Sequence, residues 1–229
     1  AQILTSLKQY APQVSYFTSA QQNAIAAAST LTQMQTALNF DVTNNELAYR
    51  GQERSDYNMS VGQSELASGQ VYYNAKYPLS EITSLYSFGG ISYRNGKSYA
   101  FNRLPNGSGT FTQVYGNGFL PEIESDILDA SAAVGVTTEL FGFDTDLSSN
   151  LGTNSFKYDV NNTINATLGT NSPFSFDAGK VSFLQSTTNL DFSRKYDVLA
   201  GLNVAFGGEF RYENYQIKQG EEASYGLYD

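Results

Sequence analysis

The chain has 229 residues with no Cys, His or Trp, and 22 acidic against 13 basic side chains give it a formal net charge of −9. The lack of Cys and His removes disulfides, thiol metal sites and the commonest general base, so we predict no enzyme, no cofactor and no metal site. The negative charge argues against nucleic acid as a partner. No apolar run reaches the roughly 18 residues that a membrane-spanning helix needs.

Residues 1–44 are predicted to form a separate first region, with an irregular lead-in around Pro12 and one helix over residues 19–38. That stretch is rich in Ala, Gln and Leu and has no Gly or Pro to break a helix. Thr18 or Ser19 would cap it, because each is followed three residues later by Gln. Apolar residues three or four apart predict a modest stripe that packs on a neighbouring element: Ile25, Ala28, Leu31, Met34 and Leu38.

From Asn45 to Asp229 the pattern is β. The first strand ends before a turn at Pro78, and the next runs over residues 83–95 to the Asn95-Gly96 dipeptide, which is a strong turn signal. Residues 96–129 show no convincing strand and are predicted to be one long loop. This loop would carry an acidic cluster: Glu122, Glu124, Asp126 and Asp129.

Four further strands are predicted at residues 130–140, 156–168, 181–194 and 202–217. The last is the clearest, with Leu, Val, Phe and Tyr on one side of residues 202–213 and Asn, Glu and Arg on the other. The connection within residues 142–155 could be short or long, depending on how far the flanking strands extend. Asp144 and Asp146 are assigned to a turn in that connection, in preference to a calcium loop.

The order of the connections suggests a membrane protein. They run short, long, undecided, medium and short, and if the undecided one is short, all short connections fall at one end of the sheet. This is the arrangement of an outer-membrane barrel, whose turns are short on the periplasmic side and longer on the extracellular side. Alternation alone does not separate such a barrel from a soluble sandwich, because both have one apolar and one polar face.

Several segments resemble the barrel region of TonB-dependent outer-membrane receptors, in order and with the spacing of that family. They span the chain from about Asn45 to Asp229 and comprise residues 115–123, 154–156, 160–169, 172–179, 189–194 and 205–211. The resemblance implies an antiparallel transmembrane β-barrel of 22 strands in the cell outer membrane, contacting lipid. It also implies a plug domain, a small-molecule ligand, and import driven by the inner-membrane TonB complex.

The chain departs from that plan in two ways. It shows no plug-like segment, and the seven or eight strands that we expect in all, of which six are placed along the chain, are too few to close so wide a barrel. We therefore expect residues 45–229 to be an internal piece of a longer receptor that imports a scarce nutrient such as a siderophore, a cobalamin or an oligosaccharide. The alternatives are a passive outer-membrane porin and a secreted β-rich protein that binds a surface or a carbohydrate.

The candidate ligand-binding residues are aromatic and charged side chains of the long loop and of two strands: Arg94, Tyr99, Phe101, Arg103, Tyr115, Glu209 and Arg211. The aromatic members could form a platform that stacks sugars or flat chelates, or belong to the girdle that anchors a barrel at the membrane interface. Glu209 and Arg211 are expected to form ion pairs across neighbouring strands more readily than to contact a substrate.

Overall fold

The computed structural model describes residues 2–39, 42–60, 62, 64–105, 107–198 and 200–228. They divide into two compact units, Ala1–Asn58 and Met59–Asp229. The first unit contains the helices α1 (Gln2–Tyr10), η1 (Ala11–Gln13), α2 (Ser19–Ala27), α3 (Leu31–Leu38), α4 (Asn44–Arg50) and η2 (Arg54–Tyr57). The second contains β1 (Glu65–Pro78), β2 (Ser84–Tyr99), β3 (Glu122–Leu140), β4 (Phe143–Asn161), η3 (Ala166–Asn171), β5 (Ser175–Tyr196), β6 (Leu202–Lys218) and α5 (Glu222–Tyr225). None of the described helices has the length and apolar character to cross a membrane.

The single helix predicted over residues 19–38 is two helices. The chain leaves helical geometry at Ala28, where ψ is 124°. Thr30 then caps α3 through a capping box with Gln33, whose side chain also accepts from the Ser29 hydroxyl. The new cap satisfies the free backbone donors of a second helix start, so the break costs little despite the favourable composition.

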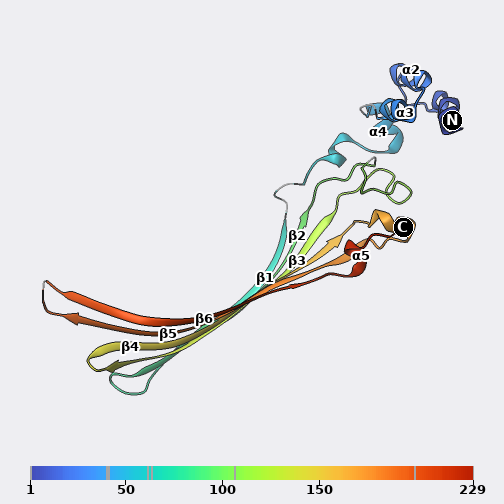
Figure 1. Ribbon diagram of the computed structural model, residues 1–229. Helices are drawn as coiled ribbons and strands as arrows, with labels where there is room; N and C mark the ends of the chain where they lie inside the picture. The colour runs from blue at the N-terminus through green and yellow to red at the C-terminus, as the bar shows by residue number, and fades with distance from the viewer. Residues whose placement is uncertain are drawn as a thin grey trace. The chain divides into compact units, whose positions relative to one another are not determined.

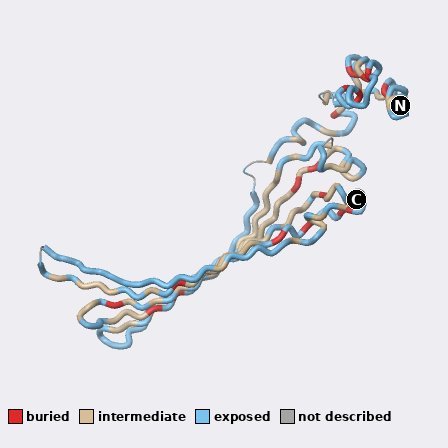
Figure 2. Tube along the Cα trace, in the orientation of Figure 1, coloured by how far each residue is buried: buried red, intermediate tan, exposed pale blue. Residues whose placement is uncertain are grey.

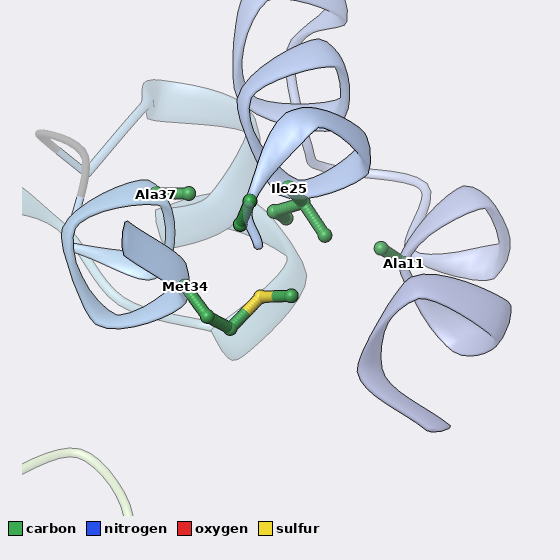
Figure 3. Close-up of a cluster of buried hydrophobic side chains, with 5 residues drawn as sticks. Ala11, Ile25, Met34 and Ala37 are labelled. Carbon is green, nitrogen blue, oxygen red and sulfur yellow. The ribbon is translucent and has the colours of Figure 1, made fainter. Parts of the chain in front are cut away.

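The break changes which apolar side chains are buried. Ile25 and Met34 are each only 1 % exposed and face one another in the small core of the helical unit, completed by Ala11, Ala28 and Ala37 (Figure 3). Leu31 and Leu38 belong to the predicted stripe but remain 54 % and 38 % exposed. The prediction was wrong for these two because α3 starts a new helical phase after the break.

Strand structure begins at Glu65, later than the expected Asn45. The intervening stretch contains α4, which Thr43 caps by accepting a hydrogen bond of 3.1 Å from the Glu46 backbone. The helix ends at Gly51, whose φ of 67° lies in the left-handed region that favours glycine.

The second unit is built on one antiparallel sheet of six strands in the order β1 to β6, each paired with its neighbour in the chain (Figure 1). The predicted antiparallel β architecture is confirmed, and the predicted count of seven or eight strands was wrong. Within the described residues the sheet is open, because β1 pairs only with β2 and β6 only with β5. Both edge strands therefore leave one side of their backbone unpaired.

The strands are 14 to 22 residues long, which is longer than predicted. β2 passes through Asn95 and Gly96, because these residues pair with Asp126 and Ser125 of β3. The turn predicted at this dipeptide was wrong, since the ladder outweighs a local turn preference. The long loop shortens to residues 100–121, and the predicted acidic loop cluster lies on β3 instead.

The undecided connection before β4 is a turn made of Phe141 and Gly142 alone. Their φ values of 55° and 76° are both positive, as a tight hairpin turn of type I′ requires. The strand predicted over residues 156–168 is the end of β4, and it stops at Asn161. Asn162 has a φ of 49°, and residues 166–171 form η3, so the predicted strand positions after 161 were wrong.

The connections alternate in length along the chain. Residues 79–83, 141–142 and 197–201 form short connections at one end of the sheet, which we call the turn end. Residues 100–121 and 162–174 form longer connections at the opposite end, the loop end. The sequence-based expectation of short turns at one end and longer loops at the other is confirmed.

The two faces of the sheet differ in charge. Residues paired in an antiparallel ladder point to the same face, so the register assigns every strand residue to a side. One side, the apolar face, includes Val71, Tyr73, Leu85, Ile91, Val134, Val136, Leu147, Leu151, Leu184, Leu190, Phe206 and Phe210. The opposite side, the charged face, includes Lys76, Arg94, Asp129, Glu139, Asp144, Asp146, Asp191, Glu209, Arg211 and Glu213.

Toward the loop end the distribution is reversed, because apolar-face positions carry charged residues and charged-face positions carry apolar ones. Lys157, Lys180 and Lys218 lie side by side on β4, β5 and β6 at apolar-face positions, and we call them the lysine row. Beyond the row, apolar-face positions carry Lys97, Glu124 and Asp159. Charged-face positions near and beyond the row carry Ile123, Ile127, Phe156, Tyr158, Val160, Val181 and Phe176.

Few side chains of the sheet unit are buried (Figure 2). Among its described apolar residues, Phe119, Ala133, Ile164 and Phe176 are at most 9 % exposed. Large side chains on the apolar face remain open, such as Val71 at 70 % and Phe210 at 70 %. A sheet normally covers its apolar face with another layer, and this sheet supplies no such layer.

Candidate functional site

The predicted ligand-binding residues do not form one cluster. Arg94 lies on the charged face of β2, and Glu209 and Arg211 lie on the same face of the edge strand β6. Tyr99 ends β2, and the other three predicted residues belong to the connection 100–121. The set therefore falls into three places.

Arg94 is held by a carboxylate of the neighbouring strand. Its Nη2 donates to Asp129 Oδ2 at 2.7 Å, and Asn154 Nδ2 donates to the other oxygen of the same carboxylate at 2.5 Å. The Arg94 Nε is buried without a hydrogen-bond partner among the described residues. The ion pair fixes the guanidinium on the charged face and leaves one donor that a ligand or water could satisfy.

Tyr99, Phe101 and Arg103 lie at the base of the long connection. Lys97 Nζ is 5.9 Å from the Tyr99 ring centroid, which allows a cation–π contact. The Phe101 side chain is 65 % exposed. The Arg103 backbone donates to Phe119 O at 2.7 Å and accepts from Phe119 N at 2.9 Å, so this residue closes the loop through its main chain.

Tyr115 joins the two long connections. Its ring stacks on Phe119 at 4.4 Å and meets Phe174 edge-on at 5.9 Å. Its hydroxyl donates to Asn162 Oδ1 at 3.0 Å. Burial raises the pKa of the Tyr115 phenol above its ordinary value. No ring contact joins Tyr115 to Tyr99 or Phe101 among the described residues, so these three rings form no common platform here.

Glu209 and Arg211 pair along one strand. Arg211 Nη2 is 3.0 Å from Glu209 Oε1, and Arg211 Nη1 is 3.8 Å from Glu213 Oε1. Toward β5 the expectation of ion pairs across neighbouring strands was wrong, because the facing residues of β5 are uncharged: Asn189 and Thr187. All three charged side chains remain about half exposed, which keeps these pairs weak.

Asp144 and Asp146 belong to β4 and not to a turn. Both point to the charged face. The hydroxyl of Tyr86 on β2 reaches over the intervening strand β3 and donates to Asp146 Oδ1 at 2.9 Å. The turn prediction was wrong because the hairpin closes earlier, at Phe141 and Gly142. No group of three or more acidic residues in the described part of the chain is placed to hold a metal ion.

The acidic residues of β3 are tied to neighbouring strands. Lys97 Nζ is 2.7 Å from Glu122 Oε2, and Asn95 Nδ2 donates to Glu124 and Asp126 at 3.1 and 3.0 Å. Asp126 also accepts from the Tyr93 hydroxyl. These bonds make the acidic cluster part of the polar surface at the loop end of the sheet.

A shallow groove of about 440 Å³ on the charged face was not predicted from the sequence. Its floor is made of small residues that include Gly90, Ser131 and Gly152. Aromatic side chains and amides rise from the same face around it: Tyr72, Phe88, Phe183, Asn150, Asn154 and Gln185. These residues occupy alternate positions on five strands, so only the strand register brings them together.

Comparisons with protein-family models, curated proteins and solved structures find no match for this chain.

Proposed function

We propose that the sheet is part of the wall of an outer-membrane β-barrel that belongs to a TonB-dependent nutrient receptor. The apolar face would contact lipid, and the charged face would line the lumen. The observation that carries this proposal is the separation of charge between the two faces.

On all six strands, apolar-face positions between the level of Arg194 near the turn end and the level of the lysine row carry no Asp, Glu, Lys or Arg. On β5, for example, the residues between Arg194 and Lys180 on this face are Phe192, Leu190, Thr188, Ser186, Leu184 and Ser182. The charged-face residues over the same stretch include ten that carry charge. Lipid tolerates Ser and Thr far better than charge, so this distribution suits a face that meets acyl chains.

The length of the uncharged stretch matches a bilayer. At about 3.3 Å per residue, β5 extends about 46 Å from Lys180 to Arg194. With the 35–45° tilt of strands in such barrels, this corresponds to roughly 33–38 Å along the membrane normal. A hydrocarbon core is about 30 Å thick and reaches about 40–45 Å with its headgroups, so both cations would lie among the headgroups.

The exposed edges of the sheet also favour a larger barrel. β1 is exposed along its whole length, and apolar side chains such as Leu66 remain open next to its unpaired backbone. An unpaired strand edge is not tolerated in lipid, because the backbone groups would lose their hydrogen bonds. Further strands beside β1 and β6 would satisfy these groups.

The strands also continue past the lysine row, where charged side chains lie on the apolar face and apolar side chains lie on the charged face. A wall that leaves the membrane meets water on its outer side, which suits Lys97, Glu124 and Asp159. Its inner side can then pack against loops, which suits Phe176, 4 % exposed. The residues Arg94, Tyr115 and Arg211 and the groove around Gly152 would face the lumen or its mouth, where a nutrient passes.

The membrane part of the proposal can be tested by spin labelling, because the chain has no native Cys. Single Cys substitutions at each position from Phe183 to Phe192 would carry a nitroxide in the full protein in its own bilayer. Collision rates with oxygen, which partitions into lipid, should be high at even positions and low at odd ones. Equal oxygen accessibility at both sets of positions would overturn the lipid-facing assignment.

The receptor part needs a separate measurement, because a passive porin would give the same labelling pattern. The protein purified from the outer membrane would be inserted into a planar bilayer in potassium chloride. A plugged receptor should conduct almost no ions, since its lumen is filled. Steady open-channel currents would instead support a porin.

A further inference from the structure

The lysine row places three like charges side by side. Lys157 pairs with Lys180 in the β4–β5 ladder, and Lys180 pairs with Lys218 in the β5–β6 ladder. Directly opposed side chains in an antiparallel pair have Cβ atoms about 4.5–5.5 Å apart, and like charges at this distance repel. A row of three lysines therefore costs stability unless anions neutralise it.

The protein neutralises only one member of the row. Lys157 Nζ is 2.6 Å from Asp159 Oδ2 and 3.8 Å from Asp177 Oδ2. Lys180 and Lys218 are exposed and have no ion-pair partner among the described residues. An external anion is thus the available partner for these two ammonium groups.

In the proposed function, the lysine row also lies at the depth of the lipid headgroups. It is the first charged row on β4, β5 and β6 after the uncharged stretch, at the loop end, which in the proposed function is the extracellular side. Arg194 lies on the same face at the other end of that stretch, with its guanidinium 4.9 Å from the Tyr196 ring centroid. Along β5, Lys180 and Arg194 are thus roughly 33–38 Å apart along the membrane normal, which places both among the headgroups.

We infer that Lys180 and Lys218, flanked by Lys157, bind the phosphate groups of anionic lipid in the outer leaflet. This inference rests on the proposed function, since it needs the apolar face to contact the bilayer. It adds a specific lipid site on the outside of the wall, separate from any ligand path through the lumen. The uncharged side chains toward the turn end, such as Leu184, would contact the acyl chains of the same lipid.

The test measures lipid selectivity by electron spin resonance. The full protein would be reconstituted with spin-labelled phosphatidylglycerol or spin-labelled phosphatidylcholine, and the fraction of each lipid immobilised on the protein would be compared. The variant is Lys180→Gln with Lys218→Gln. The matched control is Lys76→Gln with Lys195→Gln, which removes two lysines from the charged face.

The unaltered protein should prefer phosphatidylglycerol at the site. Each lysine near a membrane surface contributes attraction equivalent to about five-fold in association, so the double variant should lose most of the preference and the control should keep it. An unchanged preference in Lys180→Gln with Lys218→Gln, with immobilised lipid still present, would overturn the lysine site alone. If neither lipid is immobilised on the unaltered protein, both the lipid site and the membrane-spanning proposal fail.

Discussion

The same six strands build the loop end of the sheet and the uncharged stretch between the lysine row and the turn end, but the apolar side chains of these two regions lie on opposite faces. In the uncharged stretch they lie on the apolar face and have no protein cover, as Phe210 and Leu151 show. At the loop end the apolar side chains lie on the other face, where Phe176 is buried and Phe156 stacks on Tyr158 at 4.3 Å. One strand can therefore present its apolar side chains to opposite faces along its length, and the lysine row marks where the apolar side chains change face.

The largest effect should come from Phe176 at the loop end. Phe176→Ala removes a buried ring, which typically costs about 3–5 kcal/mol of unfolding free energy. Phe101→Ala, at a 65 % exposed position, is the matched control and should cost under about 1 kcal/mol. Urea unfolding followed by tyrosine fluorescence would measure both. Equal losses would mean that Phe176 is not packed in a protein core at the loop end.

A charge placed in the uncharged stretch should distinguish the two faces of the sheet. Leu151→Arg puts a cation in the middle of the uncharged stretch, at a cost of about 2–4 kcal/mol if that face meets lipid. Asn150→Arg changes the adjacent residue, which points to the charged face, and should cost much less. Unfolding in vesicles of outer-membrane lipid would measure the difference. A larger loss of stability in Asn150→Arg than in Leu151→Arg would contradict the assignment of the apolar face to lipid.

Two glycines on the charged face sharpen the comparison within the stretch between the lysine row and the turn end. A Cβ on Gly135 would lie 2.3 Å from the Tyr86 ring, whereas a Cβ on Gly152 would meet nothing within 4 Å. Gly135→Ala must displace the ring of Tyr86, whose hydroxyl donates to Asp146. It should lower the free energy of unfolding by about 1–3 kcal/mol. Gly152→Ala should change stability by under about 1 kcal/mol. Thermal unfolding of both variants tests whether Tyr86 packs on the bare backbone of Gly135.

The sequence predicts the sheet better than it predicts the limits of its strands. Alternation along residues 202–213 and turn residues such as Pro78 are local signals, so the antiparallel order and the rhythm of connections could be anticipated. The end of β2 could not, because Asn95 and Gly96 favour a turn locally while their pairing with β3 keeps them extended. The predicted strand after Asn161 failed for the opposite reason, since alternation continued where pairing did not.

The candidate site was predicted less well, because contacts across strands depend on register. Arg94 and its partner Asp129 are 35 residues apart in the chain, and nothing local indicates that they meet. The groove around Gly152 likewise combines residues of five strands. Glu209 and Arg211, two residues apart on one strand, were recognisable as a charged pair, but the uncharged partners on β5 were not.

The smallest effect concerns Tyr115, which links the two long connections at the loop end. Tyr115→Phe keeps the stacking on Phe119 and removes the hydrogen bond to Asn162, so stability should fall by about 1 kcal/mol. Because burial raises the pKa of Tyr115 in the folded protein, the phenol keeps its proton at a pH where the unfolded chain has lost it. Its contribution to stability is therefore complete below the ordinary tyrosine pKa and declines as pH rises above it.

An ultraviolet titration of the folded protein should show tyrosines that ionise above the ordinary tyrosine pKa, and Tyr115→Phe should reduce the amplitude of that late step by one tyrosine. Tyr225→Phe removes a hydroxyl at a position 56 % exposed and provides the control, since it should leave the stability nearly unchanged. Amide exchange in residues 162–174 should also accelerate in Tyr115→Phe, because Asn162 loses one of its two hydrogen bonds to the other connection and keeps the one to Leu120 O. If the titration and the exchange rates are both unchanged, the two long connections are held together by the aromatic rings and by the hydrogen bond from Asn162 to Leu120, without help from the Tyr115 hydroxyl.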